Sequence, residues 1–264
     1  QVQHKAAGIN DLVLGRAELP VPEILTEKNM MQVRAAKKLI RKKRRQYEIQ
    51  NRPFSDMKPD TQLAEYLDRT TFINKEGDVC EFTELQKHDL NLVLQKRFAL
   101  LNWQQGSGKT AAVYHRAKYL LKYRKVRNVI ILAPAIATNM TWVPFLTINR
   151  ERFRMVRNNA DLETVPEGVF LVLSTSMLGK LKRGLTKFIR RTSRKLCLVF
   201  DESDEITNPS SQRTRHILGI FRRLKYKILD TGTTTRNNIA ELYSQFELLY
   251  NNSVNMVCWC DRIY

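Results

Sequence analysis

From about residue 80 onward, uninterrupted apolar runs alternate with longer amphipathic stretches, and this alternation constrains the fold more than any other feature of the sequence. Continuous apolar runs are typical of strands buried on both faces, as in a parallel sheet covered by helices. They predict strands at Arg97–Trp103, Val129–Leu132, Val169–Leu173, Leu196–Phe200 and Tyr226–Leu229. The stretches between them predict helices at Thr110–Tyr123, from Thr141–Phe145 onward, and at Met177–Arg191, Ser211–Leu224 and Asn237–Tyr250. This order favours a doubly wound α/β domain, with a mostly parallel sheet and helices on both faces.

Residues 1–80 differ from the rest of the chain because they are weakly apolar and rich in positive charge. Their clearest element is a predicted helix at Gln32–Gln50, in which eight Lys and Arg side chains fall within residues 34–45. Like charges at this density repel one another, so the helix needs a partner or a packing surface. The phosphate backbone of a nucleic acid is one interpretation. A solvated helix face, or a tail ordered only within a larger assembly, is the other.

The chain of 264 residues carries 45 Lys and Arg against 26 Asp and Glu, a net charge of +19. A globular chain this basic favours a polyanionic partner, most commonly nucleic acid, over an anionic membrane surface or a plain solubilising excess of charge. No stretch reaches the roughly 18 uncharged apolar residues of a membrane span, so no membrane partner is expected. The four cysteines make no disulfide framework, which predicts a reducing, intracellular setting.

The segment Gly106-Ser107-Gly108-Lys109-Thr110 follows the first predicted strand and opens the first helix, which is the context that a phosphate-binding loop requires. Glycines let the backbone turn tightly, so that its N–H groups and the helix N-terminus can surround phosphate oxygens. Lys109 would reach the β- and γ-phosphates, and the Thr110 hydroxyl would bind Mg²⁺. The alternative is a Gly/Ser turn with an incidental lysine. Trp103 stands where the strict motif has glycine, and we interpret it as a packing residue.

A second predicted strand, Leu196–Phe200, ends in two acidic residues, Asp201 and Glu202. Ligands of α/β sheets bind at strand ends, so the acidic pair belongs at the same edge as the phosphate loop. Asp201 would hold Mg²⁺, directly or through water, and Glu202 would polarise the water that attacks the γ-phosphate. Alone, such a pair is more often a turn. Together with the loop it predicts an ATPase or GTPase.

These motifs resemble those of the superfamily 2 helicases, in particular the Swi/Snf chromatin-remodeller-type ATPases. Asp201–Asn208 (DESDEITN) resembles motif II and Asp230–Tyr243 (DTGTTTRNNIAELY) resembles motif III of that family. Ala133-Pro134 with Trp142 resembles motif Ia, and Leu173–Ser176 resembles motif Ib. The resemblance covers residues 80 to 250, and the divergence of its motifs suits a viral, phage or mobile-element relative.

The resemblance implies a RecA-like P-loop NTPase lobe at residues 81–250. It also implies a basic, largely helical extension at 1–80 and, at 251–264, the start of a connection to a missing second RecA-like lobe. ATP and Mg²⁺ are the implied ligands. The implied catalytic residues are Lys109, Asp201 and Glu202. The implied nucleotide-binding residues are Gln86, Gly106, Ser107, Gly108, Lys109 and Thr110, of which Gln86 would read adenine. The implied Mg²⁺ ligands are Thr110 and Asp201. The implied coupling residues of motif III are Thr231, Gly232, Thr233 and Arg236.

A second cationic cluster lies between motif Ib and the motif II strand, where the resembling family makes DNA contacts. Phosphate contacts there are one interpretation, and a solvated helix is the other. The candidate residues are Lys180, Lys182, Arg183, Lys187, Arg190 and Arg191.

The expected activity of the intact protein is DNA-stimulated hydrolysis of ATP to ADP and phosphate, coupled to translocation on double-stranded DNA. Family members hold ATP between two lobes, and the second lobe supplies an arginine finger, so we expect an isolated lobe to hydrolyse ATP poorly. One alternative is a strand-separating helicase or RNA-dependent ATPase. The other is a degenerate, non-hydrolysing nucleic-acid-binding or structural module, which three departures from the family motifs, Asp204, Thr234 and Arg236, favour.

Overall fold

The computed structural model describes residues 15, 18–19, 26–232 and 242–250, and the chain divides into two compact units at residues 1–58 and 59–264. The first unit contains one long helix, α2 (Glu27–Asn51), and a short 3₁₀ turn, η1 (Phe54–Asp56). The hydroxyl of Thr26 caps α2 by accepting a hydrogen bond from the backbone N–H of Asn29 at 3.2 Å. The helix therefore starts more than one turn earlier than the charge pattern predicts.

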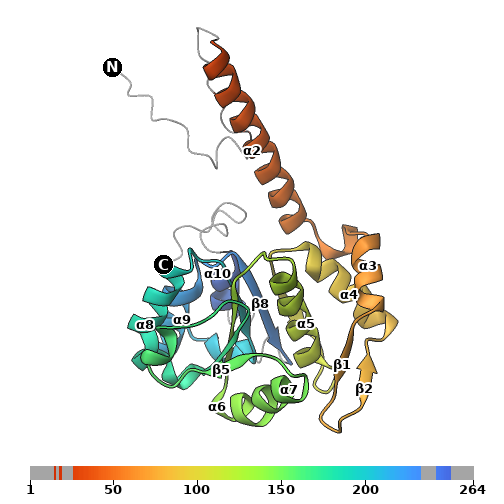
Figure 1. Cartoon of the computed structure of the whole chain (residues 1–264), viewed down its shortest axis with the longest axis vertical. Coiled ribbons are helices and arrows are strands. Elements are labelled where there is room, and N and C mark those ends of the chain that lie inside the picture. The colour runs from red at the N-terminus through yellow and green to blue at the C-terminus, as the bar shows by residue number, and fades with distance from the viewer. Residues whose placement is uncertain (1–14, 16–17, 20–25, 233–241, 251–264) are drawn as a thin grey trace. The chain divides into compact units, whose positions relative to one another are not determined.

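The second unit is built on a six-stranded parallel sheet, of which β8 and β5 are labelled in Figure 1. The strands lie in the order β3-β8-β7-β4-β6-β5. The strands are β3 (Phe98–Asn102), β4 (Asn128–Ala133), β5 (Phe153–Met155), β6 (Phe170–Ser174), β7 (Leu196–Phe200) and β8 (Tyr226–Thr231). In the central strands β4 and β7 every residue is buried, which is the physical reason that their sequences are apolar without alternation.

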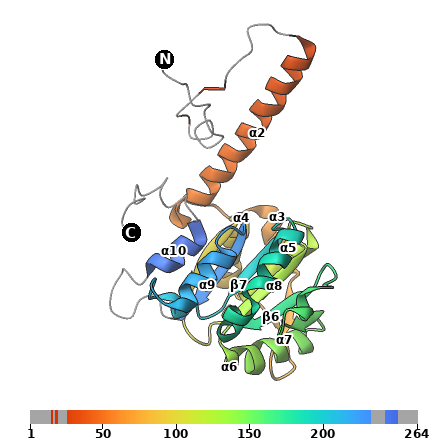
Figure 2. The ribbon, with the colours of Figure 1, turned by 90° about the vertical axis from the view of Figure 1, so that its left-hand side faces the viewer.

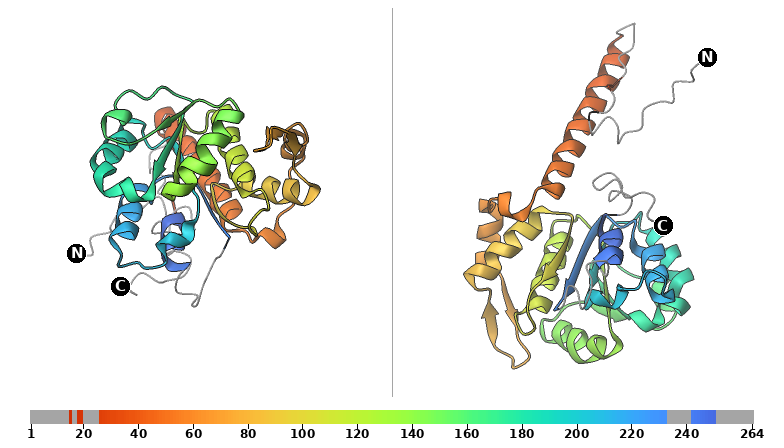
Figure 3. Two further views of the ribbon diagram at one scale, coloured as in Figure 1. Left: turned by 90° about the horizontal axis from the view of Figure 1, so that it is seen from below. Right: turned by 180° about the vertical axis from the view of Figure 1, so that it is seen from behind.

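Helices cover both faces of this sheet, and each face has its own apolar core. On one face lie α4 (Glu84–Gln95), α5 (Lys109–Lys122) and α7 (Val143–Ile148), and on the other lie α8 (Leu178–Arg191), α9 (Gln212–Phe221) and α10 (Tyr243–Tyr250). Figures 2 and 3 show α8 and α9 side by side on their face, opposite α4 and α5. Successive residues of a strand serve the two cores in turn: Val129 and Ile131 pack under α5, and Ile130 and Leu132 pack under α8 and α9.

Short elements complete the second unit. They are α3 (Thr61–Asp68), which packs on α4, the antiparallel hairpin β1 (Thr71–Ile73) and β2 (Val79–Glu81), α6 (Ala135–Ala137), and the turns η2 (Thr138–Trp142), η3 (Ala160–Leu162), η4 (Thr175–Met177) and η5 (Ser203–Ile206). The predicted fold class, an α/β lobe with a mostly parallel sheet, is confirmed. Among the described residues no helix is both long and apolar enough to cross a bilayer.

Lys227 is a charged residue inside this core, because it lies within β8 with only 1% of its surface exposed. Its Nζ donates hydrogen bonds to the carbonyl oxygens of Arg222, at 2.9 Å, and of Leu248 in α10, at 2.5 Å. Lys227 thus joins the strand that ends in motif III to the helix that follows it. Burial lowers the pKa of Lys227 to about 7.

We predict that this lysine makes the stability of the protein depend on pH. The folded chain releases the Lys227 proton near pH 7, whereas the unfolded chain holds it to about pH 10.5, so the unfolded state binds more protons between these values. The free energy of unfolding of the wild type, relative to Lys227→Met, should therefore rise by up to about 1.4 kcal/mol per pH unit over that interval. Urea denaturation at pH 7 and pH 9 measures this difference, with the exposed Lys225→Met as the control. A difference that does not change with pH would contradict the prediction.

Candidate nucleotide-binding site

The sheet order places four loops side by side at the carboxyl edge of the sheet. The chain crosses from β3 through α5 to β4, and β8 and β7 lie between these two strands. The phosphate loop follows β3, motif III begins at the end of β8, Asp201 follows β7 and the motif Ia segment follows β4. A crevice at such a switch in strand order is where open α/β sheets bind ligands. The residues of four separate sequence motifs thus meet at one edge.

The phosphate loop has the backbone geometry that its glycines allow. Gly106 and Gly108 have φ angles of +78° and +80°, a conformation that residues with a side chain rarely adopt. A Cβ on Gly108 would also lie 3.3 Å from the amide nitrogen of Gln86. Helix α5 begins directly afterward at Lys109, so its first N–H groups face the loop. Free N–H groups at the start of a helix form a site for phosphate.

The ammonium group of Lys109 lies over the end of β3. It donates hydrogen bonds to the carbonyl oxygens of Trp103, at 3.0 Å, and of Gln104, at 3.2 Å. A Cβ placed on Gly232 would be 3.4 Å from the same Nζ, so Lys109 also reaches the beginning of motif III. These carbonyls give the ammonium only neutral partners. A phosphate oxygen would be a stronger, charge-assisted acceptor.

Gln86 contacts the phosphate loop rather than standing apart from it. Its side-chain oxygen accepts a hydrogen bond from the backbone N–H of Thr83, at 2.8 Å, which completes the capping box of α4. Its amide nitrogen donates to the carbonyl oxygen of Ser107, at 2.9 Å. Gln86 thereby ties the start of α4 to the loop. Its predicted contact with adenine stays a prediction.

Asp201 is held by a tryptophan that follows the neighbouring strand β4. The indole Nε1 of Trp142 donates to Oδ2 of Asp201 at 2.7 Å, and the Trp142 side chain is fully buried. Trp142 ends a π-helical turn, Thr138–Trp142. Such turns are rare in proteins, and those that occur are often found at functional sites. Burial raises the pKa of Asp201, while the hydrogen bond from Trp142 and the charge of Lys109 lower it. The indole therefore fixes one carboxylate oxygen and favours the ionised form.

Glu202 has a φ of +54°, in the left-handed region that non-glycine residues seldom occupy. This backbone conformation turns the chain directly from β7 into η5. Burial raises the pKa of Glu202, and so do the nearby charges of Asp201 and Asp204. A carboxylate whose pKa is shifted toward neutral pH is better matched to taking a proton from water.

Asp230, the second-last residue of β8, contributes a third carboxyl group to this edge. It is not among the site residues predicted from the sequence. It is fully buried, and no N–H or hydroxyl group of the described residues donates to its oxygens, but its carboxyl group lies close enough to that of Asp201 for the two to share a proton. Burial raises its pKa well above the ordinary value, as do the charges of Asp201 and Glu202. The available signal was an acidic residue directly after the apolar residues Ile228 and Leu229, which resembles the position of Asp201 after β7.

The side chains at this edge fit a divalent cation that is bound together with a nucleotide. Three carboxyl groups, Asp201, Glu202 and Asp230, influence one another, and among the described residues the ammonium group of Lys109 lowers the pKa of each. In the described part of the chain no three His, Cys, Asp or Glu side chains are grouped so that they could hold a metal ion. Mg²⁺ would therefore take phosphate oxygens and water among its ligands, which is its usual coordination in proteins.

A hydrogen bond connects motif II to the helix that follows motif III. Ser203 Oγ donates to the side-chain oxygen of Gln245 in α10 at 3.2 Å, and both residues are fully buried. This contact links motif II to α10, although Asp204 replaces the histidine that is usual at the fourth position of motif II. Of the predicted coupling residues, Thr231 ends β8 and Gly232 follows it, whereas Thr233 and Arg236 lie outside the described residues.

The six candidate nucleic-acid residues are all exposed on α8. At about 100° per residue, five of them, all except Lys182, fall within an arc of about 100° opposite the buried apolar face of the helix. Three of the five, Arg183, Lys187 and Arg191, line a surface cavity of about 310 Å³ between α8 and η3. Cations gathered on one side of a helix can follow a row of phosphates, which cations scattered around it cannot.

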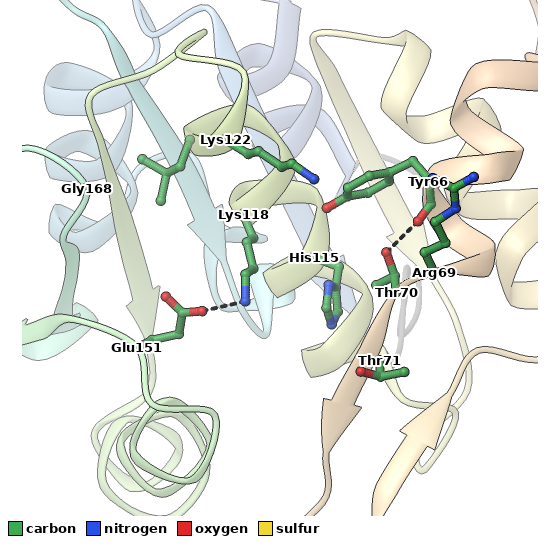
Figure 4. Close-up of a pocket in the computed structure, with 10 residues that line it drawn as sticks. Tyr66, Arg69, Thr70, Thr71, His115, Lys118, Lys122, Glu151 and Gly168 are labelled. Carbon is green, nitrogen blue, oxygen red and sulfur yellow. Dashed lines mark hydrogen bonds and ion pairs between the residues drawn. The ribbon is translucent and has the colours of Figure 1, made fainter.

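A larger cavity, of about 440 Å³, is lined by other residues (Figure 4). Arg69, Lys118 and Lys122 contribute positive charge, and Glu151 forms an ion pair of 2.7 Å with Lys118. His115 also lines this cavity, and burial lowers its pKa to about 3. None of the residues predicted for the nucleotide site lines it.

The fold is a RecA-like α/β lobe, and this chain is similar to SWI2/SNF2 ATPase cores, the class of protein that the sequence resemblance predicted. The SWI2/SNF2 ATPase core of Sulfolobus solfataricus in complex with double-stranded DNA has a TM-score of 0.53 to this chain. It is 17% identical, over 64% of this chain and 36% of that core. The UvsW helicase from bacteriophage T4 has a TM-score of 0.50 and is 14% identical, over 71% of this chain and 66% of that protein.

Sequence comparison gives a relative of the same kind. The Caenorhabditis elegans homolog of the SWI/SNF-related matrix-associated actin-dependent regulator of chromatin subfamily A containing DEAD/H box 1 is 24% identical over 171 residues. The match covers 61% of this chain and 17% of that protein. No family model matches the sequence.

The hydrogen bond between Trp142 and Asp201 gives a testable prediction about metal binding. Trp142→Phe keeps an aromatic ring but removes the indole N–H, so Asp201 loses the donor that orients it. Losing such a partner typically lowers metal affinity about 10- to 100-fold. The Mg²⁺ concentration that half-maximally tightens nucleotide binding should rise by that factor, while affinity without Mg²⁺ stays unchanged. Trp103→Phe is the matched control, because the Trp103 indole donates to Asp89 instead. Equal Mg²⁺ dependence in both variants would contradict the prediction.

Proposed function

We propose that this chain is the ATP-binding lobe of a DNA-stimulated ATPase that translocates on double-stranded DNA and hydrolyses ATP to ADP and phosphate. The observation that carries the proposal is the adjacency of the phosphate loop, the Asp201–Glu202 pair and the start of motif III on neighbouring strands. The archaeal core to which the chain is similar is in complex with double-stranded DNA, which supports the same class of partner here. We further propose that a second RecA-like lobe completes the site.

In the proposed mechanism the phosphate loop binds and orients the nucleotide. The N–H groups at the start of α5 hold phosphate oxygens, and Lys109 exchanges its two carbonyl partners for the β- and γ-phosphates. Thr110 and Asp201 would hold Mg²⁺, which when bound neutralises charge on the phosphates. Trp142 keeps the Asp201 carboxylate in place. Positioning and charge stabilisation of this kind supply most of the catalysis in phosphoryl transfer.

Glu202 orients the attacking water in this mechanism. Its carboxylate accepts a hydrogen bond from water placed in line with the bond to the leaving ADP, and it takes the proton as that bond breaks. The raised pKa of Glu202 makes its carboxylate a stronger base than that of an ordinary glutamate. As the pH is lowered, turnover should therefore begin to fall at a higher pH than it would with a glutamate of ordinary pKa.

We propose that the cationic stripe of α8 binds the phosphate backbone of DNA. Helix α8 starts after the carboxyl end of β6 and returns to the start of β7, so its 14 residues run between opposite edges of the sheet. Lys180 lies at the edge that carries the nucleotide site, and Arg190 and Arg191 lie at the other. Such contacts position a duplex without reading its sequence.

The test of the proposed function is ATP turnover with and without duplex DNA, by a protein that contains this chain and its second lobe. Turnover should rise with DNA and be lost in Lys109→Ala. An Arg183→Gln/Lys187→Gln variant should need more DNA for half-maximal stimulation, whereas an Arg223→Gln/Lys225→Gln control should not. Turnover that is absent, or the same with and without DNA, would overturn the proposal.

Strand separation is the second candidate activity, since the T4 helicase shares this fold. A displacement assay on a partial duplex, run beside a triplex-displacement assay for translocation, distinguishes the two. If the paired strand is released, strand separation becomes the proposed activity in place of translocation on intact duplex.

A further inference from the structure

We infer that helix α2, which the proposed nucleotide site does not involve, is a separate binding surface for the phosphate backbone of duplex nucleic acid. The helix holds a dense group of exposed cations, and acidic residues occur only near its ends, at Glu27 and Glu48. The inference rests on the proposed function only in that both assume a nucleic acid as the partner. It needs no nucleotide.

The cations of α2 are concentrated on one side of the helix. At about 100° per residue, six of them lie within an arc of about 140°. They are Arg34, Lys37, Lys38, Arg41, Lys42 and Arg45, all exposed and none in an ion pair with a described residue. Only Lys43 lies on the opposite side, at about 180° from Arg34. The smaller apolar positions Val33, Ala36 and Ile40 lie away from the cationic arc.

The charge spacing of this face matches a nucleic-acid duplex. Residues 34–45 extend over about 17 Å of helix axis, and duplex DNA carries about ten phosphate charges over the same length. Positive side chains three and four residues apart repel one another when the helix is free. Phosphates between them would remove that repulsion and stabilise the helix. If the face is only solvated, the repulsion between the positive side chains is not compensated.

An anionic membrane surface fits α2 less well, because the exposed apolar side chains form no single face. Met31 and Leu39 are 70% and 46% exposed, yet they lie about 80° apart and are separate from Val33 and Ile40. A helix that lies in a membrane interface needs one broad apolar face of large side chains. The cationic arc is therefore the binding surface, and its ligands are the phosphates of a nucleic acid in solution rather than those of a membrane.

The test measures binding of the full chain to a duplex of about 30 base pairs, without nucleotide, across a range of salt concentrations. The variant replaces the centre of the arc: Arg34→Gln, Lys38→Gln, Arg41→Gln and Arg45→Gln. Glutamine keeps helix propensity, so circular dichroism should report an unchanged helix content. A charge-matched control replaces four exposed cations of the second unit, Lys75, Arg215, Arg223 and Lys225, by glutamine.

The variant should lower the slope of log K against log salt by about 3 to 4, because each lost phosphate contact removes about 0.9. Its Kd at 0.1 M salt should rise at least about 100-fold, and that of the control less than about 10-fold. Between single variants, Arg41→Gln should weaken binding more than Lys43→Gln, since only Arg41 lies on the arc. RNA and DNA duplexes of one sequence show which nucleic acid is preferred.

Equal slopes for the variant and the control would overturn the inference. So would tighter binding to vesicles of anionic lipid than to either duplex, with the same variant abolishing it. Failure of the proposed ATPase is a separate outcome, because these measurements contain no nucleotide and can be repeated in Lys109→Ala. Binding through α2 that persists in that background supports the inference even if no DNA-stimulated turnover exists.

Discussion

Lys109→Ala should weaken ATP binding by this chain by at least about 100-fold. The ammonium group lies over the end of β3 beside the loop, and hydrogen bonds to a charged group contribute about 1.5 to 3 kcal/mol each. In the proposed mechanism two phosphates share this lysine, so both contacts would disappear together. Calorimetric titration with ATP and Mg²⁺ measures the change in Kd.

Lys122→Ala is the matched control for this prediction. It removes the same side chain from the other end of the same helix, where Lys122 is exposed and lies over the rings of Tyr66 and Tyr123. Its ATP affinity should equal that of the wild type. Lys109→Ala also removes two hydrogen bonds to loop carbonyls and the positive charge beside three carboxyl groups, so thermal unfolding of both variants is measured to separate lost affinity from lost stability. ATP binding that survives Lys109→Ala would contradict the placement of phosphate on this loop.

Glu202→Gln should lower ATP turnover by about 10²- to 10⁴-fold while ATP affinity is kept or improves. Glutamine has the same shape and tolerates the same backbone conformation, but it cannot take a proton from the attacking water. Removing one of three neighbouring carboxylates also reduces repulsion of the nucleotide phosphates. Turnover is measured in a protein that carries the second lobe, and affinity is measured in parallel.

Glu205→Gln is the control for Glu202→Gln. Glu205 lies three residues further along in the same turn, and its carboxylate pairs with Arg213 at 3.4 Å. We expect that variant to retain turnover within a few-fold. Equal losses in both variants would assign the effect to the turn as a whole. Wild-type turnover in Glu202→Gln would remove this residue from the catalytic step.

The strands were predictable because burial on both faces leaves a strong signal. Val129–Leu132 and Leu196–Phe200 agree with β4 and β7 to within a residue or two, and every residue of these strands is buried. β5 (Phe153–Met155) was not predicted, since it has three half-buried residues and an arginine at its centre. Helix α4 was also missed. Its polar face and short length give a weaker periodic pattern than α8.

The candidate site was predictable only as a set of separate strings. Lys109 and the Asp201–Glu202 pair carry recognisable chemistry, and their positions after apolar strands assigned them to one edge of a sheet. The sequence held no signal that Trp142 donates to Asp201, because the donor and acceptor are 59 residues apart. Asp230 belongs to the motif III segment, but its burial beside Asp201 and Glu202 depends on the pairing of β8 with β7.

The sequence by itself determined the class of fold, the phosphate loop, the acidic pair and the strongly basic character of the chain, because each depends on residues adjacent along the chain. The tertiary structure alone decided that β8 and β7 lie between β3 and β4. That order places Lys109 beside Gly232 and Trp142 on Asp201. Strand order follows from how helices pack over the two faces of the sheet. It is therefore a property of the whole core and is not written in any one motif.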